Sequence, residues 1–252
     1  MIKKVDEDVF VIGTGISSNS VLIVGKRDSI VVDTTLFPER AKNILKVSRE
    51  LGCEVSLVIN THYHPDHTFG NAIFEGKRIV SHRMTVDFME RMDEEYIKAV
   101  WKGKEGKIVV PNEIFDDRKT LQFDGLELEL IHMGGHTPDS TIVFIPQKGI
   151  LITGDIVMNN IHAEIVEDSE LDEWLENLQY MIYMKPKIVI PGHGETGDLD
   201  IVKGMYDYLQ KVKRFLNGAL GYEDLVSDSN VRDRKYPELF LWGIDNLIRR
   251  SS

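Results

Sequence analysis

The run His62-Tyr63-His64-Pro65-Asp66-His67 places three histidines and one aspartate within six residues. Imidazole nitrogens and carboxylate oxygens are the ligand types that zinc and similar divalent ions accept in proteins. The run follows the apolar segment Val55–Ile59 and is closed by Thr68-Phe69-Gly70-Asn71. We therefore expect these side chains to project from a loop at the end of a strand into the start of a helix, where they form a metal site.

Three further residues of metal-ligating type follow apolar, strand-like segments. His136 lies in Met133-Gly134-Gly135-His136-Thr137-Pro138-Asp139-Ser140, Asp155 in Thr153-Gly154-Asp155, and His193 in Pro191-Gly192-His193-Gly194-Glu195. A glycine beside each of these residues lets the backbone turn sharply and approach other groups closely. Four apolar strands that each end in such a loop predict that their side chains complete one metal centre.

At these residues the chain resembles the metallo-β-lactamase fold superfamily, whose ligand motifs occur in this order, and the resemblance extends from about Val9 to about Tyr208. It implies an α/β protein with a four-layer α/β/β/α sandwich. Asp33, in Ile30-Val31-Val32-Asp33-Thr34, would support the ligand loops from behind. The resemblance also implies three ligands for one ion, three for a second ion, and one bridging aspartate: His62, His64 and His136; Asp66, His67 and His193; and Asp155.

This ligand set indicates a binuclear metal-dependent hydrolase. Two divalent ions about 3.5–4 Å apart acidify a shared water, which supplies a hydroxide near neutral pH. Asp66 is the candidate catalytic residue, because a ligating carboxylate can also orient the hydroxide or pass a proton to the leaving group. An ester, thioester, lactone, lactam or phosphodiester bond of a small molecule is compatible with these residues.

Zinc is the favoured ion, and iron, manganese and nickel are alternatives, because histidine–carboxylate sets accept each of them. The competing function is an iron-dependent oxidoreductase or an oxygen- or nitric-oxide-binding protein on the same fold. Diiron reductases of this fold typically carry Glu at the second ligand position and a flavodoxin domain, whereas this chain has His64 and no such domain. A non-enzymatic binding protein would require degraded ligands, and none is degraded.

The composition limits the partners. The chain has 252 residues, of which 42% are hydrophobic, and this is enough for one sizeable core. Its net charge of −11 argues against a nucleic-acid partner, which calls for a basic surface. Residues 1–8 lack the apolar run of a secretory signal, no segment reaches transmembrane length, and Cys53 is the only cysteine. We therefore expect a cytoplasmic protein without a membrane partner or a disulfide framework.

We expect a catalytic domain over residues 1–198 and a C-terminal helical extension over residues 199–252, packed on the same domain. Apolar residues recur at three- and four-residue spacing from Ile201 to Leu216, and a second apolar set follows Pro237. A packing cap is the default interpretation of this extension, and a homodimer contact or a pocket wall is left open. Other helices are expected at three places: Glu39–Leu51, Thr85–Trp101 and Leu171–Met184.

Several polar residues lie outside the ligand set. His162 and Asn160 follow Asp155 closely and are candidates for contact with substrate. His82 ends a short strand before a charged segment and is interpreted as a hydrogen-bonding helix cap. His132 precedes the Gly134-Gly135 turn and is interpreted as a buried supporting residue.

Overall fold

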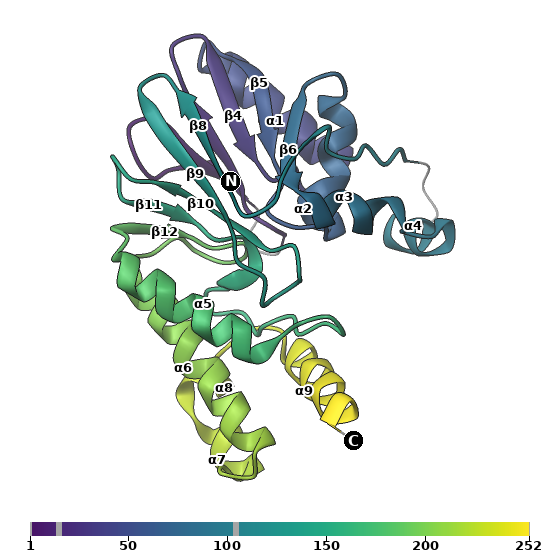
Figure 1. The fold of residues 1–252 in the computed structure, drawn as a ribbon, viewed down its shortest axis with the longest axis vertical. Helices are drawn as coiled ribbons and strands as arrows, with labels where there is room; N and C mark the ends of the chain where they lie inside the picture. The colour runs from purple at the N-terminus through teal and green to yellow at the C-terminus, as the bar shows by residue number, and fades with distance from the viewer. Residues whose placement is uncertain (1, 14–16, 103–105, 252) are drawn as a thin grey trace.

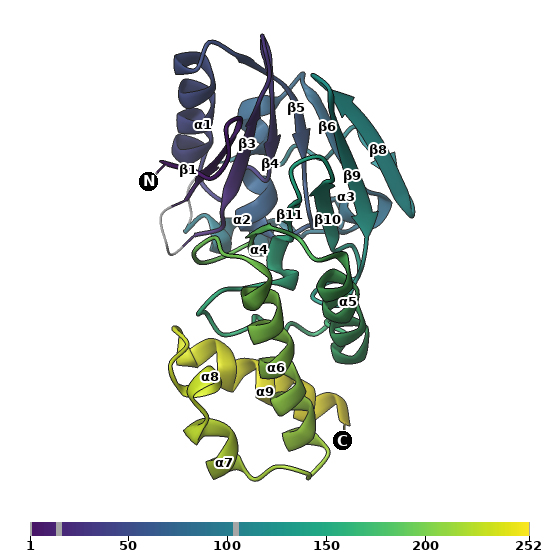
Figure 2. The same cartoon turned by 90° about the vertical axis from the view of Figure 1, so that its left-hand side faces the viewer.

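The structure is a computed structural model that describes residues 2–13, 17–102 and 106–251. Two β-sheets pack face to face, and helices cover the outer face of each sheet (Figures 1 and 2). This is the predicted four-layer α/β/β/α sandwich. Among the described residues, no helix combines the length and the apolar character that crossing a membrane requires.

The first sheet has the strand order β1-β2-β3-β4-β5-β6-β7 within the described residues. Neighbouring strands pair antiparallel from β1 to β4 and parallel from β4 to β7. The strands are β1 (Ile2–Lys4), β2 (Val9–Ile12), β3 (Ser20–Val24), β4 (Asp28–Val32), β5 (Glu54–Ile59), β6 (Arg78–His82) and β7 (Glu113–Phe115).

The second sheet has the order β12-β11-β10-β9-β8. Its strands pair antiparallel except for β11 and β12, which are parallel and therefore end at the same edge. The strands are β8 (Arg118–Phe123), β9 (Leu126–His132), β10 (Thr141–Ile145), β11 (Ile150–Ile152) and β12 (Ile188–Ile190).

Helices fill the outer layers and the C-terminal region. The helix α1 packs on the first sheet, while α5 and α6 pack on the second. Figure 2 shows α7, α8 and α9 grouped at the end of the molecule that lies away from the first sheet. The helices are α1 (Pro38–Glu50), α2 (Pro65–Thr68), α3 (Arg83–Glu90), α4 (Glu94–Val100), α5 (Leu171–Met184), α6 (Leu199–Leu216), α7 (Tyr222–Ser227), α8 (Ser229–Arg232) and α9 (Pro237–Ser251), with 3₁₀ turns η1 (Phe69–Phe74) and η2 (Gly154–Ile156).

The strand β3 shows why the inner layers are so apolar. Its side chains alternate between the two faces of the sheet, as the strand geometry requires. Val21 and Ile23 pack against the second sheet, whereas Leu22 packs against α1, and all three are buried. Both faces of the first sheet are covered, so a continuous apolar run replaces the usual apolar–polar alternation.

The helix expected over Thr85–Trp101 is wrong as one element, because the chain forms α3 and α4 with a break at residues 91–93. Asp93 caps the new helix by accepting a hydrogen bond from the Tyr96 backbone N–H at 2.6 Å. An aspartate at an N-cap stabilises a helix start over continuation of the previous turn. The expected cap at His82 is confirmed, since its Nδ1 accepts from the Met84 N–H at 3.3 Å.

The C-terminal extension is tied to the body of the protein by Arg234. Its guanidinium is buried and donates to the carbonyl oxygens of Ile161 at 2.8 Å and Gly204 at 3.2 Å, while its Nε donates to Asn230 at 2.8 Å. It also lies 4.3 Å from the ring centroid of Tyr208. Burial lowers the pKa of Arg234 to about 10, so the group stays charged at neutral pH. One side chain thus joins α6, α8 and the loop that follows Asp155.

Replacing Arg234 by methionine keeps the apolar stem and removes every donor. We expect the free energy of unfolding to fall by about 2–4 kcal/mol, because several buried carbonyls lose their partners. Urea denaturation measures this change. The matched control is Arg249→Met, which removes an exposed ion pair with Asp245 and should change stability by about 0.5 kcal/mol or less. Equal effects of the two substitutions on stability would contradict the role of Arg234 in joining the extension to the body of the protein.

Candidate metal centre

The loop after β5 carries the first four candidate ligands. Pro65 starts the single turn α2, and the backbone N–H of His67 donates to the carbonyl of His64 at 3.0 Å. The Thr68 hydroxyl donates to the same carbonyl at 2.9 Å. This turn brings His62, His64, Asp66 and His67 to one side of the loop, and the three histidines are buried.

The other candidate ligands come from strand ends of the second sheet. His136 lies between β9 and β10, Asp155 lies in η2 after β11, and His193 follows β12. A Cβ atom added to Gly192 would overlap the Asp155 carboxylate, so only glycine lets these two loops meet. The glycine beside His193 is therefore required because it lies against another candidate ligand, Asp155.

One group of four side chains forms the first half of the centre: His62, His64, His136 and Asp155. The His136 Nε2 and His64 Nδ1 atoms lie 3.3 Å apart, and the Asp155 Oδ2 lies 3.9 Å from His62 Nε2 and 3.8 Å from His136 Nε2. Nitrogen ligands at 2.0–2.1 Å around a tetrahedral zinc are separated by roughly 3.3 Å. These spacings suit ligand atoms that face one small cation.

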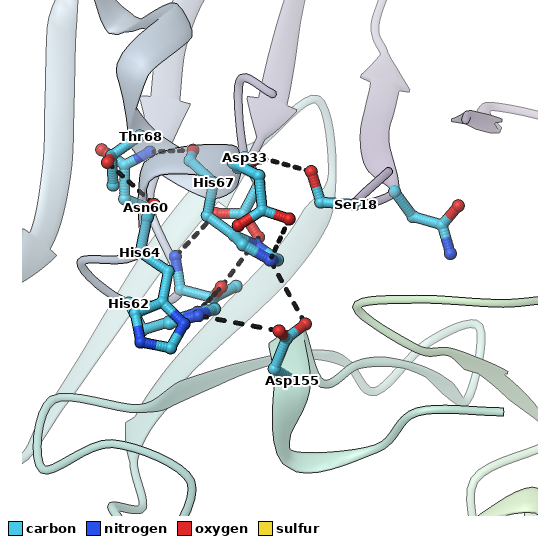
Figure 3. A network of polar contacts seen from close by, with 12 residues as sticks. Ser18, Asp33, Asn60, His62, His64, His67, Thr68 and Asp155 are labelled. Atoms are coloured by element: carbon cyan, nitrogen blue, oxygen red, sulfur yellow. Dashed lines mark hydrogen bonds and ion pairs between the residues drawn. The ribbon is translucent and has the colours of Figure 1, made fainter. Parts of the chain in front are cut away.

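A second group lies beside the first and contains Asp66, His67 and His193. Asp66 Oδ2 lies 3.1 Å from His193 Nε2 and 3.9 Å from His67 Nε2. Asp155 reaches this group as well, with Oδ1 at 3.2 Å from His67 Nε2 and Oδ2 at 3.5 Å from His193 Nε2. Figure 3 shows the Asp155 carboxylate with dashed contacts to His62 of the first group and His67 of the second.

Atoms that lack hydrogen bonds test whether the residues fit metal ions. Nε2 of His62, Nε2 of His67 and both oxygens of Asp155 are buried, and none has a hydrogen-bond partner among the described residues. Unpaired buried polar atoms are costly, and a buried carboxylate is the most costly of these. Divalent cations would satisfy all four atoms, so the donor set fits the ions that the sequence predicted.

The aspartates of the centre raise the pKa of two of its histidines. Burial acts to lower the pKa of His193, but Asp155 and Asp66 outweigh it and raise that pKa to about 10. The pKa of His67 is likewise raised well above its ordinary value, mainly by Asp155 and Asp33, against the effect of burial. In contrast, burial and the neighbouring His64 lower the pKa of His136 to about 3.

Asp33 lies directly behind the ligand loop. It accepts from His67 Nδ1 at 2.8 Å, from the Thr61 backbone N–H at 2.8 Å and from the Thr61 hydroxyl at 2.7 Å. The backbone φ of Asp33 is 60°, in the left-handed region that few residues other than glycine adopt. This strained conformation and its three hydrogen bonds fix the ring of His67 with Nε2 directed at Asp155 (Figure 3).

A further polar network behind the ligand loop was missed by sequence reasoning. The His67 carbonyl accepts from Asn60 Nδ2 at 3.1 Å and from the Thr34 backbone N–H at 2.9 Å. Asn71 joins the two, with its Nδ2 donating to Asn60 Oδ1 at 2.8 Å and its Oδ1 accepting from the Thr34 hydroxyl at 2.9 Å. The sequence feature that could have indicated this network is the presence of polar residues directly after β4 and β5.

The two candidate substrate contacts, His162 and Asn160, belong to the loop that follows Asp155. His162 is buried, its Nδ1 lies 3.1 Å from the Tyr208 hydroxyl, and its ring centroid is 5.0 Å from that of Phe240. It therefore packs the extension against the body of the protein. Asn160 is exposed, with φ of 56°, and its carbonyl accepts from the Lys235 N–H at 2.9 Å.

Two pockets adjoin the centre instead. One of about 180 Å³ lies beside His193, and one of about 390 Å³ lies beside Asp66. Glu164, which sequence reasoning did not single out, lines both pockets, and its Oε2 lies 4.0 Å from His64 Nδ1. Burial raises the pKa of Glu164, and Asp66 adds to this effect.

The fold and these side chains define a class, namely α/β/β/α sandwiches with a histidine- and aspartate-rich centre at one edge of the sheets. A sequence profile described as the Metallo-beta-lactamase superfamily matches residues 13–193. The chain belongs to this superfamily, which confirms the resemblance and the predicted fold.

Individual relatives are distant. The chain is 24% identical over 196 residues to a metallo-beta-lactamase type 2 of Bacteroides fragilis, covering 75% of this chain and 73% of that protein. It is also 24% identical over 178 residues to an atrochrysone carboxyl ACP thioesterase of Aspergillus fumigatus, covering 70% of this chain and 37% of that protein. Both names describe hydrolases, in agreement with the expected class of enzyme.

Solved structures of similar fold include a metallo-beta-lactamase from Pontibacter korlensis, with a TM-score of 0.68 and 24% identity over 83% of this chain and 98% of that chain. The DIM-1 metallo-beta-lactamase also gives a TM-score of 0.68 and 24% identity, over 83% of this chain and 96% of that chain. At this level of identity the likeness establishes the fold.

Replacing Asp33 by alanine should weaken metal binding at the Asp66, His67 and His193 group by about 10–100-fold, because His67 loses the partner that orients its ring. Zinc titration against a chromophoric chelator measures the affinities. Asp116→Ala, which removes an exposed partner of Arg83, is the control and should leave both affinities unchanged. Unchanged binding in the Asp33 variant would contradict the orienting role.

Zinc affinity should also rise with pH. An incoming ion must displace the protons on His67 and His193, and the pKa of His193 is raised to about 10. Between pH 6.5 and 9 the weaker affinity should therefore increase roughly tenfold per pH unit for each proton displaced. The same chelator titration, corrected for protonation of the chelator, tests this, and a pH-independent affinity would argue against protonated histidines in the metal-free protein.

Proposed function

We propose that this protein is a binuclear metal-dependent hydrolase of a small molecule. One observation carries the proposal: seven histidine and aspartate side chains converge in two adjoining groups, and Asp155 faces both. The buried ligand atoms without hydrogen-bond partners support the binding of cations at this place.

Two ions would share these ligands. His62, His64 and His136 would hold one ion, the group that contains Asp66 would hold the other, and Asp155 would contact both. Zinc is favoured by the nitrogen-rich set, and iron, manganese or nickel would also suit it. When bound, a pair of divalent ions lowers the pKa of water enough to supply hydroxide near neutral pH and stabilises negative charge on the attacked oxygen.

Asp66 is placed to act on the substrate as well as on an ion. Its side chain is 27% exposed and lines the larger pocket, whereas the Asp155 side chain is fully buried. Burial acts to raise the pKa of Asp66, but His67 and His193 outweigh it, so the carboxylate is ionised at neutral pH. An ionised carboxylate at the pocket wall can accept a proton from the nucleophile and pass it to the leaving group.

An acyl bond is the best-supported target. The names of the two curated relatives describe a lactamase and a thioesterase, and both cleave a bond between a carbonyl carbon and a heteroatom. We therefore favour ester, thioester, lactone or lactam cleavage over phosphodiester cleavage. The iron-dependent oxidoreductase remains the alternative function for this scaffold.

Replacing Asp66 by asparagine should preserve the fold and lower hydrolytic turnover by at least about 100-fold, because the amide cannot accept and return a proton. A panel of lactam, lactone, thioester, ester and phosphodiester substrates is used to find the activity, and kcat is then compared. Asp87→Asn, on the exposed side of α3, is the control and should leave kcat unchanged. Near-normal turnover of this variant would contradict the role of Asp66 in proton transfer.

Elemental analysis of the purified protein should give two equivalents of a divalent metal per chain. Removal of metal by a chelator should abolish hydrolysis, and zinc should restore it. A redox-active iron signal together with no hydrolysis of any panel substrate would instead support the oxidoreductase alternative.

A further inference from the structure

The pocket of about 180 Å³ joins the C-terminal extension to the metal centre. His193 and Glu164 line it on the body of the protein, and the C-terminal extension contributes Tyr236, directly before α9, and Glu238 and Leu239, in its first turn. A group bound here would touch a residue of the second ligand group. The extension is therefore a pocket wall as well as a packing element.

The wall is fixed before any ligand binds. Tyr236 has a φ of 64°, which is a strained conformation for a bulky aromatic residue. Its neighbour Lys235 is held by two backbone hydrogen bonds, one from its N–H to the Asn160 carbonyl at 2.9 Å and one from the His162 N–H to its own carbonyl at 3.1 Å. Arg234, the residue before Lys235, is itself held in place by its buried hydrogen bonds to the carbonyls of Ile161 and Gly204. A preformed pocket of this kind binds with little cost of ordering.

Two acidic side chains give this pocket its unpaired charge, because His193, which also lines it, is paired with Asp66 and Asp155. Glu164 and Glu238 are both carboxylates, while Met158, Ile161 and Leu239 provide apolar surface. Within the described residues, no lysine or arginine lines this pocket, and none forms an ion pair with either glutamate. An anionic group in the pocket would meet two like charges, whereas a cation would be matched by both.

Three further features favour a cation. Glu164 also lines the pocket beside Asp66, so a cation near the centre would face a further carboxylate. Tyr236 lines the same pocket, and aromatic side chains attract ammonium groups. The net charge of −11 would in addition attract cations toward the protein.

We infer that this pocket binds a positively charged ammonium group carried on an apolar chain of the substrate, and that Glu164 and Glu238 select it. The inference rests on the proposed hydrolase function and names the substrate class for that site. Substrates with an anionic group in the same place are rejected by the two carboxylates.

Binding of a permanent cation tests the pocket without relying on activity. The probes are hexyltrimethylammonium, which cannot ligate a metal, the anion hexanesulfonate, and neutral 1-hexanol. Calorimetry with the zinc-loaded protein should show binding of the cation and weaker binding of the other two. Glu164→Gln and Glu238→Gln should each weaken cation binding by about tenfold and leave 1-hexanol unchanged. Glu176→Gln, which removes an exposed charge on α5, should have no effect.

Hydrolysis of a matched ester series gives the second measurement. The substrates are 4-nitrophenyl esters of 6-aminohexanoate, hexanoate and adipate, which differ in the charge at the far end of one chain. The amine should have the highest kcat/KM, and both glutamine variants should reduce its advantage over the neutral ester.

The two sets of outcomes separate the two proposals. Hydrolysis with no preference for the amine, and cation binding that the glutamine variants do not change, would overturn the pocket assignment and leave the hydrolase intact. Cation binding that is lost in both variants, with no hydrolysis of any substrate, would support the pocket and reject the hydrolase. Tighter binding of hexanesulfonate than of the cation would also overturn the inference.

Discussion

The buried carboxylate of Asp155 is the group on which the centre depends. Its two oxygens lack hydrogen-bond donors among the described residues, and imidazole nitrogens of His62, His67, His136 and His193 lie 3.2 to 3.9 Å from them. A buried charge must be balanced, or the ionised state is lost. Asp155 raises the pKa of His67 and His193, which favours the protonated form of both rings, and divalent ions would replace those protons. Metal binding therefore meets the same requirement as those protons, namely that the buried charge of Asp155 is balanced.

The fold brings the groups that balance the Asp155 charge to one place. Parallel pairing of β4 with β5 and of β11 with β12 brings loops from both sheets to one edge, where the candidate ligands lie within reach of one another. The apolar layer between the sheets fixes the distance between these loops, because close-packed side chains resist displacement. The C-terminal extension then closes one side of the edge through Arg234 and supplies the pocket wall.

Much of this arrangement is local in the sequence, and that part could be predicted. The run from His62 to His67 and the glycine-flanked His136, Asp155 and His193 carry their chemistry within a few residues. The break between α3 and α4 was missed because one capping residue, Asp93, outweighs a continuous helical pattern. Glu164 and Tyr236 gave no local signal, since their pocket forms only when segments about 70 residues apart in the chain pack together. The contact of His162 with Tyr208 gave no local signal for the same reason, because Tyr208 lies on a distant helix.

Anomalous diffraction at the zinc absorption edge, from crystals grown with zinc, tests the binuclear centre most directly. Two peaks about 3.5–4 Å apart are expected. One should lie among His62, His64 and His136, the other beside Asp66, His67 and His193, with Asp155 in contact with both. A single peak at full zinc occupancy, or none while the seven side chains keep their positions, would contradict the binuclear centre.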